Sequence, residues 1–510
     1  MKKILTVVLA LALLLSCASF SLADEPVTLT VMVRRNAAVN VPAEENEAWK
    51  YAAEKVGVKL NFIDVDAGSW NEKFNVMLAG GDLPDIITKT NVSAVTVKEN
   101  IELGTFLALN DYAEYLPNYM AVLESDPDLK ALVTFGDGTI GGFAQQANYA
   151  SNETKLMPTN LAIIYTPWLE AVGMEMPTTL EELYEVLKAF KEKDPNGNGV
   201  ADEIPFSPLY GQGGIKLLAN WFGLPIDTAQ NYCGYTDGKA EFLANTESYK
   251  EFLTYFHRLW AEGLLDSEVF TQNQQQVFAK GTDETMRIGM SCSSGAAIVW
   301  GDDRAWDCDA VPLLTGATAE PVWTRRPAGY VFTGIITSKC KNVEKACELR
   351  DLFYDEDGGR LAWMGIEGVS YGWSDDGTYD FIVNEENDTT SVRAKYTLQP
   401  GGGLAAAFPE AWLKTSNRAE QWFNTFNGNF AAEYGDHFAK RYPEVTYDAR
   451  DQKELDAIAA DINSYVEQTM AQFITGELDI EKDWDNYVQT INNMRLDDMI
   501  SIMQKGLDNL

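Results

Sequence analysis

The chain has few of the residues that carry thiolate, redox or nucleophilic chemistry. Its 510 residues include six cysteines and two histidines, and no cysteines are spaced as Cys-x-x-Cys. We therefore expect neither a thiolate metal site nor a dithiol redox motif. His257 and His437 each lie among aromatic residues in a segment with helical periodicity. This context predicts structural histidines rather than members of a Cys–His catalytic pair.

The cysteines also limit the possible disulfides. Without Cys17 an odd number remains, so at least one thiol stays free or pairs outside the chain. Spacing leaves two pairs open, Cys292–Cys308 and Cys340–Cys347, and cannot decide between paired and free forms.

Basic residues are scarce relative to acidic ones. There are 40 Lys and Arg against 76 Asp and Glu, giving a formal net charge of −36 spread along the chain. This balance argues against nucleic acid or an anionic membrane surface as a partner. A solvated acidic surface explains it, and it does not name a ligand.

Only one long apolar run is present, and it lies at the start of the chain. Lys2 and Lys3 precede the run 4–15, which is too short to span a bilayer comfortably. Small residues at 21–23 predict a signal peptide, residues 1–23, cleaved after Ala23. Alternatively, residues 14–17 resemble a lipoprotein box that would place a lipid on Cys17. Either outcome predicts an exported, extracellular or cell-surface protein.

The first part of the mature chain alternates between strand and helix patterns. Strand-like segments at 27–33, 58–63 and 85–88 are separated by helical spacing over 44–56 and 70–79. This β-α-β-α-β order predicts a parallel, doubly wound sheet and an α/β fold.

Similar patterns continue to the end of the chain. A helix begins after Thr179, which has capping-box spacing with Glu182. Further helices are expected over 246–263, 342–354, 452–473 and 484–505, and strands over 286–291, 309–314 and 329–337. We find no internal repeat and no low-complexity linker, so the domains should interleave rather than follow one another.

The most specific motif is a loop of oxygen-bearing residues at 194–203. Asp194, Asn196, Asn198 and Asp202 fall at positions 1, 3, 5 and 9, with glycine at position 6. This matches the first nine positions of an EF-hand-like calcium loop, in which Val200 would offer its backbone carbonyl.

The end of the loop departs from the EF-hand. Position 12 is Pro205, so Glu203 at position 10 is the nearest candidate for the bidentate carboxylate. The alternative is a hydrated turn without an ion. We predict Ca²⁺ with a structural role, because no second helix with EF-hand pairing follows.

Four stretches of the chain, residues 70–87, 176–183, 338–358 and 474–496, carry a family resemblance. Together they resemble the family 1 extracellular solute-binding proteins of ABC importers. The subgroup includes alginate-oligosaccharide-binding proteins and lipoprotein-type sugar binders. The loop ending at 202–205 is typical of this subgroup.

The resemblance implies a periplasmic-binding-protein-like fold of type II. Two lobes, each with a doubly wound sheet, would be joined by a hinge of crossing strands and followed by a helical C-terminal tail. We expect an N-lobe of residues 24–150 and 312–370, and a C-lobe of 151–311 and 371–510 that carries the calcium loop. The resemblance also implies that calcium is bound by Asp194, Asn196, Asn198, Val200, Asp202 and Glu203.

Ligand-binding residues follow from side-chain chemistry. Sugar rings need flat aromatic platforms beside amides, carboxylates or guanidinium groups. Candidates outside clear helical stripes are Trp70, Tyr149, Trp221, Trp300, Trp323, Arg325, Glu410 and Trp412. Core packing is the alternative for each ring, and a solvated pair with Arg326 is the alternative for Arg325.

These observations predict a non-enzymatic receptor. We expect a monomer that captures a carbohydrate, an oligosaccharide in particular, between its lobes and delivers it to an ABC permease. The first alternative is a receptor for a peptide or another small solute. The second is a carbohydrate-active enzyme, for which no spacing fixes a carboxylate pair.

Overall fold

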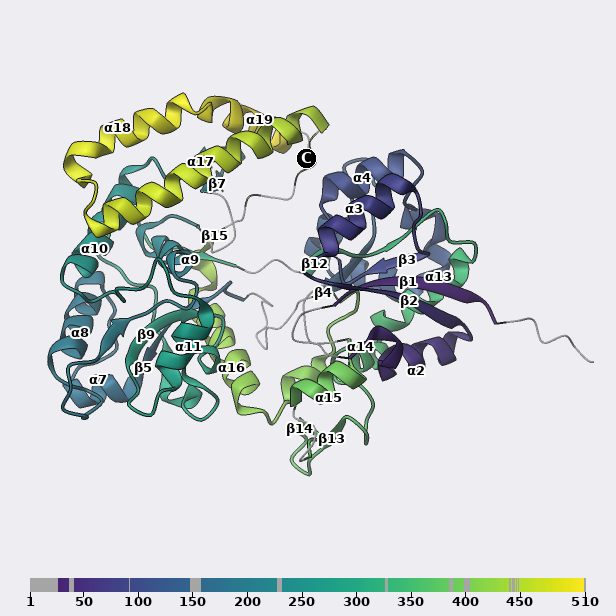
Figure 1. Ribbon diagram of the computed structural model, residues 1–510, viewed down its shortest axis with the longest axis horizontal. Coiled ribbons are helices and arrows are strands. Elements are labelled where there is room, and N and C mark those ends of the chain that lie inside the picture. The colour runs from purple at the N-terminus through teal and green to yellow at the C-terminus, as the bar shows by residue number, and fades with distance from the viewer. Residues whose placement is uncertain are drawn as a thin grey trace, which may run out of the picture.

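A computed structural model describes the protein over residues 26–35, 41–90, 92–146, 157–226, 232–325, 329–384, 389–398, 404–439, 442, 445, 447 and 449–508. Tyr149, Cys17 and the predicted signal peptide lie outside these residues. Figure 1 shows two lobes side by side, each with helices around a central sheet. The buried apolar residues accordingly fall into two separate clusters.

Lobe 1 contains the N-terminal sheet. The strands of this lobe are β1 (Thr28–Arg35), β2 (Lys59–Asp66), β3 (Ile86–Thr88), β4 (Phe143–Gln146), β12 (Gly329–Ile336), β13 (Tyr371–Trp373) and β14 (Tyr379–Phe381). Of these, β13 and β14 form a separate hairpin. Its helices are α2 (Glu47–Val56), α3 (Trp70–Gly80), α4 (Ala94–Glu102), α5 (Pro117–Ser125), α6 (Pro127–Val133), α13 (Val343–Asp351), α14 (Glu356–Trp363) and α15 (Thr389–Tyr396). Short 3-10 helices are η1 (Ala43–Glu45), η2 (Leu109–Tyr115), η5 (Leu352–Tyr354) and η6 (Glu410–Lys414).

Lobe 2 contains the remaining elements. Its strands are β5 (Leu161–Tyr165), β6 (Ile204–Phe206), β7 (Cys233–Thr236), β8 (Lys239–Phe242), β9 (Ile288–Ser293), β10 (Cys308–Ala310), β11 (Trp323–Thr324) and β15 (Phe438–Ala439). Its helices are α7 (Thr166–Val172), α8 (Leu180–Glu192), α9 (Gln212–Leu217), α10 (Glu247–Ala261), α11 (Gln274–Thr282), α12 (Ala297–Trp300), α16 (Arg418–Tyr434), α17 (Ala449–Thr475), α18 (Ile480–Asn493) and α19 (Leu496–Asp508). Its 3-10 helices are η3 (Leu218–Phe222), η4 (Ala305–Asp307) and η7 (Gly435–His437).

The sheet of lobe 1 has the strand order β2-β1-β3-β12-β4. β1 pairs in parallel with β2 and β3, while β12 runs antiparallel to both β3 and β4. Val31, Met32 and Val33 are buried one after another, as expected for a parallel strand covered on both faces. The predicted β-α-β-α-β start is confirmed.

The sheet of lobe 2 is smaller and mixed. Its order is β10-β5-β9-β6, with β5 antiparallel to β9 and β10, and β6 parallel to β9. Helix α8 begins at the predicted capping box, in which the Thr179 hydroxyl accepts from the Glu182 amide at 3.1 Å. The Glu182 carboxylate accepts from the Thr179 amide in return at 3.1 Å.

The chain passes between the lobes at 147–160, 325–328 and 415–417. The first two passages lie side by side where they are described, because the Thr159 amide donates to the Thr324 carbonyl at 3.1 Å. The structure therefore places two boundaries later than the sequence predicted. Residues 313–323 pack in the core of lobe 2, and residues 371–412 pack in the core of lobe 1. The expected breaks at 311 and 370 followed local pattern, which does not reveal the lobe that a segment joins.

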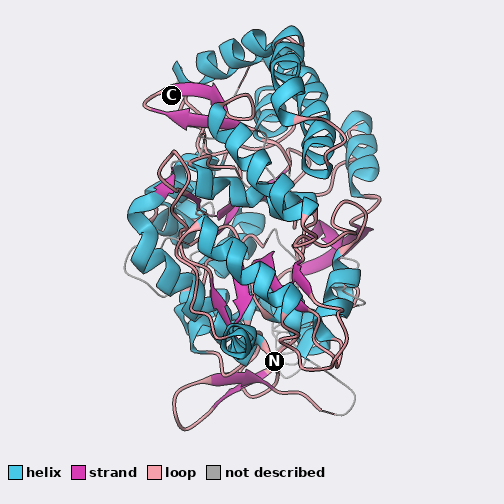
Figure 2. Ribbon diagram, turned by 90° about the vertical axis from the view of Figure 1, so that its left-hand side faces the viewer, coloured by secondary structure: helices cyan, strands magenta, loops and turns pink. Residues whose placement is uncertain are grey.

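Helices α17, α18 and α19 form one end of lobe 2 (Figures 1 and 2). The predicted helix over 484–505 is divided near Arg495, whose φ of 66° is incompatible with a continuous α-helix. The apolar side of α17, including Ile462, Val466 and Phe473, completes the core of lobe 2.

The cysteines of the described chain, from Cys233 to Cys347, are buried free thiols. Neither pairing left open by spacing, Cys292–Cys308 or Cys340–Cys347, is formed. Within the described residues, every helix is too short or too polar to cross a bilayer.

Candidate ligand-binding site

The two sheets turn corresponding edges toward the passages between the lobes. In lobe 1, β4 ends at Gln146 where the chain leaves, and β12 begins at Gly329 where it returns. The carboxyl ends of β1, β2 and β3 lie at the same edge. In lobe 2, this edge holds the amino end of β5 and the carboxyl ends of β6 and β9. We call these the hinge-facing edges, and such strand ends are where open α/β sheets bind ligands.

The hinge-facing edge of lobe 1 carries a group of charged side chains. Arg34 and Arg35 end β1, Asp64 and Asp66 end β2, and Lys89 directly follows β3. Arg35 donates to Asp66 at 2.8 Å and lies 3.8 Å from an oxygen of Asp64. The group borders a cavity of about 30 Å³, enough for one water-sized group. These residues are not among the predicted ligand contacts, although a polar residue directly after a parallel strand is a usable signal.

The hinge-facing edge of lobe 2 borders a larger cavity. It has a volume of about 360 Å³ and is lined by Tyr210, Gln212, Gly213, Lys216, Tyr232 and Glu467. The Lys216 ammonium lies 3.8 Å from the Glu467 carboxylate and 5.0 Å from the centre of the Tyr232 ring. Aromatic rings, an amide and a charged pair around a space of this size suit a small polar ligand.

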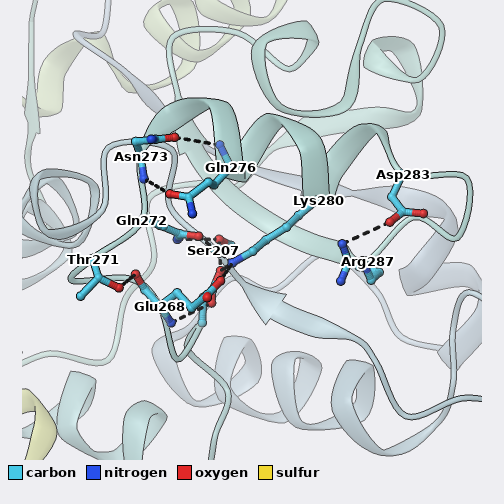
Figure 3. Close-up of polar contacts among 10 residues, drawn as sticks. Ser207, Glu268, Thr271, Gln272, Asn273, Gln276, Lys280, Asp283 and Arg287 are labelled. Carbon is cyan, nitrogen blue, oxygen red and sulfur yellow. Dashed lines mark hydrogen bonds and ion pairs between the residues drawn. The ribbon is translucent and has the colours of Figure 1, made fainter.

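A buried polar network fixes the segment that leads from β6 to this cavity (Figure 3). The Ser207 hydroxyl follows β6 directly and donates to Asp266 at 2.6 Å. The Lys280 ammonium donates to Asp266 at 2.8 Å and to Gln272 at 2.7 Å, and lies 2.7 Å from Glu268. Burial raises the pKa of Asp266, but the hydrogen bonds from Lys280 and Ser207 outweigh it and leave that pKa lowered.

Helix α16 adds buried amides beside the same edge. Both polar side-chain atoms of Asn424 and the side-chain oxygen of Asn427 are buried without a hydrogen-bond partner. A Cβ placed on Gly295, two residues after β9, would lie 3.7 Å from the Phe423 ring of this helix. The first turns of α16 therefore adjoin the loop that follows β9. Unpaired buried amides cost free energy unless water or a ligand satisfies them.

The five tryptophans predicted to bind ligand are packed inside the lobes. Trp70, Trp221, Trp300, Trp323 and Trp412 are each at most 4% exposed. Trp221 and Trp323 lie together in lobe 2 with ring centroids 6.4 Å apart. Trp70 stacks on Phe74 in lobe 1, and Trp300 donates from its ring nitrogen to Ile288 at the far end of β9. Their burial leaves no ring face to stack on a sugar in this structure.

The other predicted contacts lie near the passages between the lobes. Arg325 follows β11 and is ion-paired with Asp128 of lobe 1 at 3.6 Å. Glu410 is exposed at the start of η6. The Trp412 ring packs on the Trp363 ring, with centroids 5.5 Å apart. The structure does not bring these residues into one constellation with the other tryptophans.

The loop at 194–203 is held together by its own oxygen atoms. The Asp194 carboxylate accepts from the amides of Asn198 and Gly199 at 3.1 and 2.9 Å. The side-chain amides of Asn196 and Asn198 both donate to one oxygen of Asp202, at 3.3 and 3.0 Å. Asp194 takes a φ of 48°, which lets the loop turn sharply out of α8. The loop is therefore closed by hydrogen bonds among the side chains of Asp194, Asn196, Asn198 and Asp202 and its own backbone.

Glu203 supplies the strongest indication that this loop suits a cation. One of its carboxylate oxygens is buried without a hydrogen-bond partner. Burial raises the pKa of Glu203, and the nearby charges of Asp194 and Asp202 raise it further. No three His, Cys, Asp or Glu side chains of the described chain already form a metal cluster. The donor set nevertheless fits calcium, which accepts amide and backbone oxygens beside carboxylates.

Comparison with known proteins identifies the family. Residues 34–360 match the family described as bacterial extracellular solute-binding protein. This chain belongs to that family. The family resemblance noted in the sequence is thereby confirmed, and the protein is a solute-binding protein rather than an enzyme.

Individual relatives span almost the whole chain. The fructooligosaccharide ABC transporter substrate-binding protein FusA of Streptococcus pneumoniae is 29% identical over 89% of this chain and 85% of its own. A FusA EF-hand mutant bound to fructo-nystose superposes with a TM-score of 0.77 at 25% identity, covering 94% of this chain and 99% of FusA. A solute-binding protein from Bifidobacterium longum subsp. infantis gives 0.82 at 25% identity, covering 96% and 99%. The two-lobed fold expected for type II binding proteins is confirmed.

The buried ion pair of lobe 2 yields a prediction about stability. Lys280→Met leaves the Asp266 carboxylate buried without its cation, and we expect the free energy of unfolding to fall by about 3 kcal/mol at pH 7. Because Asp266 has a lowered pKa, this stabilisation is lost as pH falls through that pKa, so the difference should shrink in acid.

Chemical denaturation of both proteins from pH 7 to pH 3 measures this effect. Lys482→Met, at an exposed pair with Asp479, is the control and should change little. Equal losses of unfolding free energy in the two variants would contradict a stabilising role of the buried network.

Proposed function

We propose that this protein captures an oligosaccharide between its lobes and delivers it to an ABC permease. Family membership and the length-spanning similarity to FusA support a transport receptor. The structural observation that carries the proposal is the pair of polar hinge-facing edges, one in each lobe, beside the points where the chain crosses from lobe to lobe. Ligand binding would then shift an open–closed equilibrium toward the closed form.

Two tyrosines, the exposed Tyr330 and the partly buried Tyr210, are the best ring platforms for a sugar. Tyr330 is the second residue of β12, at the hinge-facing edge of lobe 1, and Tyr210 lines the cavity of lobe 2. Around them, Gln212, Asn424 and Asp64 offer amide and carboxylate groups for hydroxyls. We retain Arg325, Glu410 and Tyr149 as contacts near the passages, and assign the five buried tryptophans to core packing.

We further propose that the loop at 194–203 binds Ca²⁺ for structural support. Asp194, Asn196, Asn198, Asp202 and Glu203 would supply side-chain oxygens, and Val200 its carbonyl. One solved structure of FusA is that of an EF-hand mutant. Glu203 directly precedes β6, whose other end leads into the cavity of lobe 2. A bound cation would relieve the repulsion among the acidic groups and fix this end of the strand.

The export signal completes the proposal. The family is extracellular, and we propose that the protein is a monomer that leaves the cytoplasm through residues 1–23. Intact mass spectrometry of protein from the native membrane and from the medium distinguishes the two possible N-termini of the mature chain. A chain starting at Asp24 indicates cleavage after Ala23, and a lipid-modified chain starting at Cys17 indicates anchoring. A full-length mass from Met1 would contradict both.

Ligand binding by the exposed tyrosine can be tested directly. Tyr330→Ala removes a stacking platform, so affinity for the best-binding oligosaccharide of a glycan screen should fall about tenfold, equal to about 1.4 kcal/mol. Isothermal titration calorimetry gives the affinity, and an unchanged glycan after long incubation checks that no bond is broken.

Tyr51→Ala is the matched control. Tyr51 is 41% exposed against 42% for Tyr330, but lies on α2 of lobe 1 away from the strand ends. The proposal predicts full affinity in this variant. Equal losses in the two variants, or hydrolysis of the glycan, would contradict it.

Calcium binding is tested by thermal unfolding with and without the ion. Calcium at about 100 times its Kd should stabilise the wild-type protein by about 2.7 kcal/mol. Asp194→Ala should abolish this gain. Each protein is compared with and without calcium, which cancels any strain from the positive φ at residue 194.

The control for calcium is Asp376→Ala. Asp376 also caps a turn, accepting from the Thr378 amide at 3.0 Å in the β13–β14 hairpin of lobe 1. We expect it to retain the whole calcium response. A full response in the Asp194 variant would show that the ion binds elsewhere or not at all.

A further inference from the structure

We propose that the cavity between α9 and α17 binds one uncharged sugar residue of the captured glycan, and that the Lys216–Glu467 pair selects this residue by its hydroxyls. The inference rests on the proposed capture of an oligosaccharide and adds two points to it. Neutral glycans become the ligand class, and the C-terminal helix α17 becomes part of the binding site as well as of the core of lobe 2.

The cavity suits one sugar ring rather than a chain of rings. Its volume of about 360 Å³ is near the lower end of the range for small-molecule pockets, ~300 Å³. Gln212 at the start of α9 donates from its side-chain amide to the backbone carbonyl of Glu467 in α17, so the two helices are tied together beside the cavity. The segment that leads from β6 at the hinge-facing edge into α9 forms one wall.

A tight turn fixes the position of this wall. Gly211 has a φ of 54°, and a Cβ placed on it would lie 2.7 Å from the Val269 carbonyl oxygen. Only glycine fits such a position. Tyr210 and Gln212, on either side of Gly211, are therefore held in place before a ligand arrives, and preorganised groups lose less conformational entropy on binding.

The cation and the anion at the cavity are separated by a gap that one hydroxyl can bridge. The Lys216 ammonium lies 3.8 Å from a carboxylate oxygen of Glu467, beyond the ~2.7–3.2 Å of a direct hydrogen bond. The Lys216 side chain is 6% exposed and its ammonium lies 5.0 Å from the centre of the Tyr232 ring, whereas the Glu467 side chain is 52% exposed. A sugar hydroxyl can accept from the ammonium and donate to the carboxylate at the same time.

The same pair disfavours a charged sugar residue. A carboxylate on the ring would lie beside Glu467, and an ammonium on the ring would lie beside Lys216, so either charge meets one of its own sign. An uncharged ring avoids both repulsions and leaves the pair neutral as a whole. The partly buried Tyr210 ring, which also lines the cavity, offers a face for the C–H groups of the sugar.

Calorimetric titration with a set of oligosaccharides tests the proposal. The set contains neutral chains beside chains of the same length in which one residue is a uronate or carries an amine, and the charged residue moves along the chain from one member to the next. We expect the wild-type protein to bind the neutral chain at least tenfold more tightly than the member whose charged residue enters the cavity.

Glu467→Gln provides a readout that a structural role would not move. The new amide still accepts a hydrogen bond but no longer repels an anion. Affinity for the neutral chain should therefore fall about fivefold, while the uronate chain should bind more tightly than it does to the wild type. Because the Glu467 side chain is half exposed, the variant should fold, and thermal unfolding checks this.

Glu481→Gln is the matched control. Glu481 of α18 also pairs with a lysine of a neighbouring helix, Lys250 of α10, at 3.3 Å, but it does not line this cavity. We expect this variant to keep both the affinity and the preference of the wild-type protein.

Each outcome supports or overturns the proposal. A preference for neutral chains that weakens in Glu467→Gln alone supports it. Tighter binding of charged chains by the wild type, or an unchanged preference in Glu467→Gln, overturns it while leaving oligosaccharide capture intact. Equal changes in Glu467→Gln and Glu481→Gln overturn it too, because a general effect of net charge would explain both. Binding of none of the oligosaccharides overturns both this inference and the proposed function.

Discussion

The path of the chain between the lobes constrains the rest of the structure. In lobe 1, β4 ends and β12 begins at one edge of the sheet, and in lobe 2 β5 begins at the corresponding edge, so the strand ends there adjoin the first two passages between the lobes. Polar and charged residues collect at this edge in lobe 1, and the β6 end in lobe 2 leads into a cavity of about 360 Å³. Open α/β sheets bind ligands at such strand ends, so the topology supports a site at these edges before any particular side chain is considered.

Each lobe is built to move as a unit. The indole rings of Trp221 and Trp323 pack with Phe430 in one core, while Trp363 and Trp412 pack in the other. Dense aromatic packing resists deformation within a lobe. Strand β6 connects the loop at 194–203 to the buried network of Ser207 and Asp266, so both ends of this short strand are held by hydrogen bonds. Packing within each lobe therefore resists deformation when the lobes move relative to each other.

Much of the fold could be predicted because local pattern determined it. The alternation at 27–33, the capping box at Thr179 and the oxygen spacing at 194–203 depend on neighbours in sequence. The ligand-binding residues were harder to predict because a tryptophan such as Trp300 carries no local sign of which side of a sheet it packs against. Lobe boundaries depend on contacts between distant segments, as in the packing of residues 371–412 on lobe 1. Lys89 could have been found only by asking which residue follows each parallel strand.

The central claim is that the lobes close on a glycan that remains chemically intact. Small-angle X-ray scattering of the purified protein, with and without an oligosaccharide that binds it, measures this most directly. The account predicts a smaller radius of gyration in the bound state, and the glycan recovered afterwards should have its original mass. An unchanged radius of gyration at saturating glycan would contradict closure of the two lobes on their ligand.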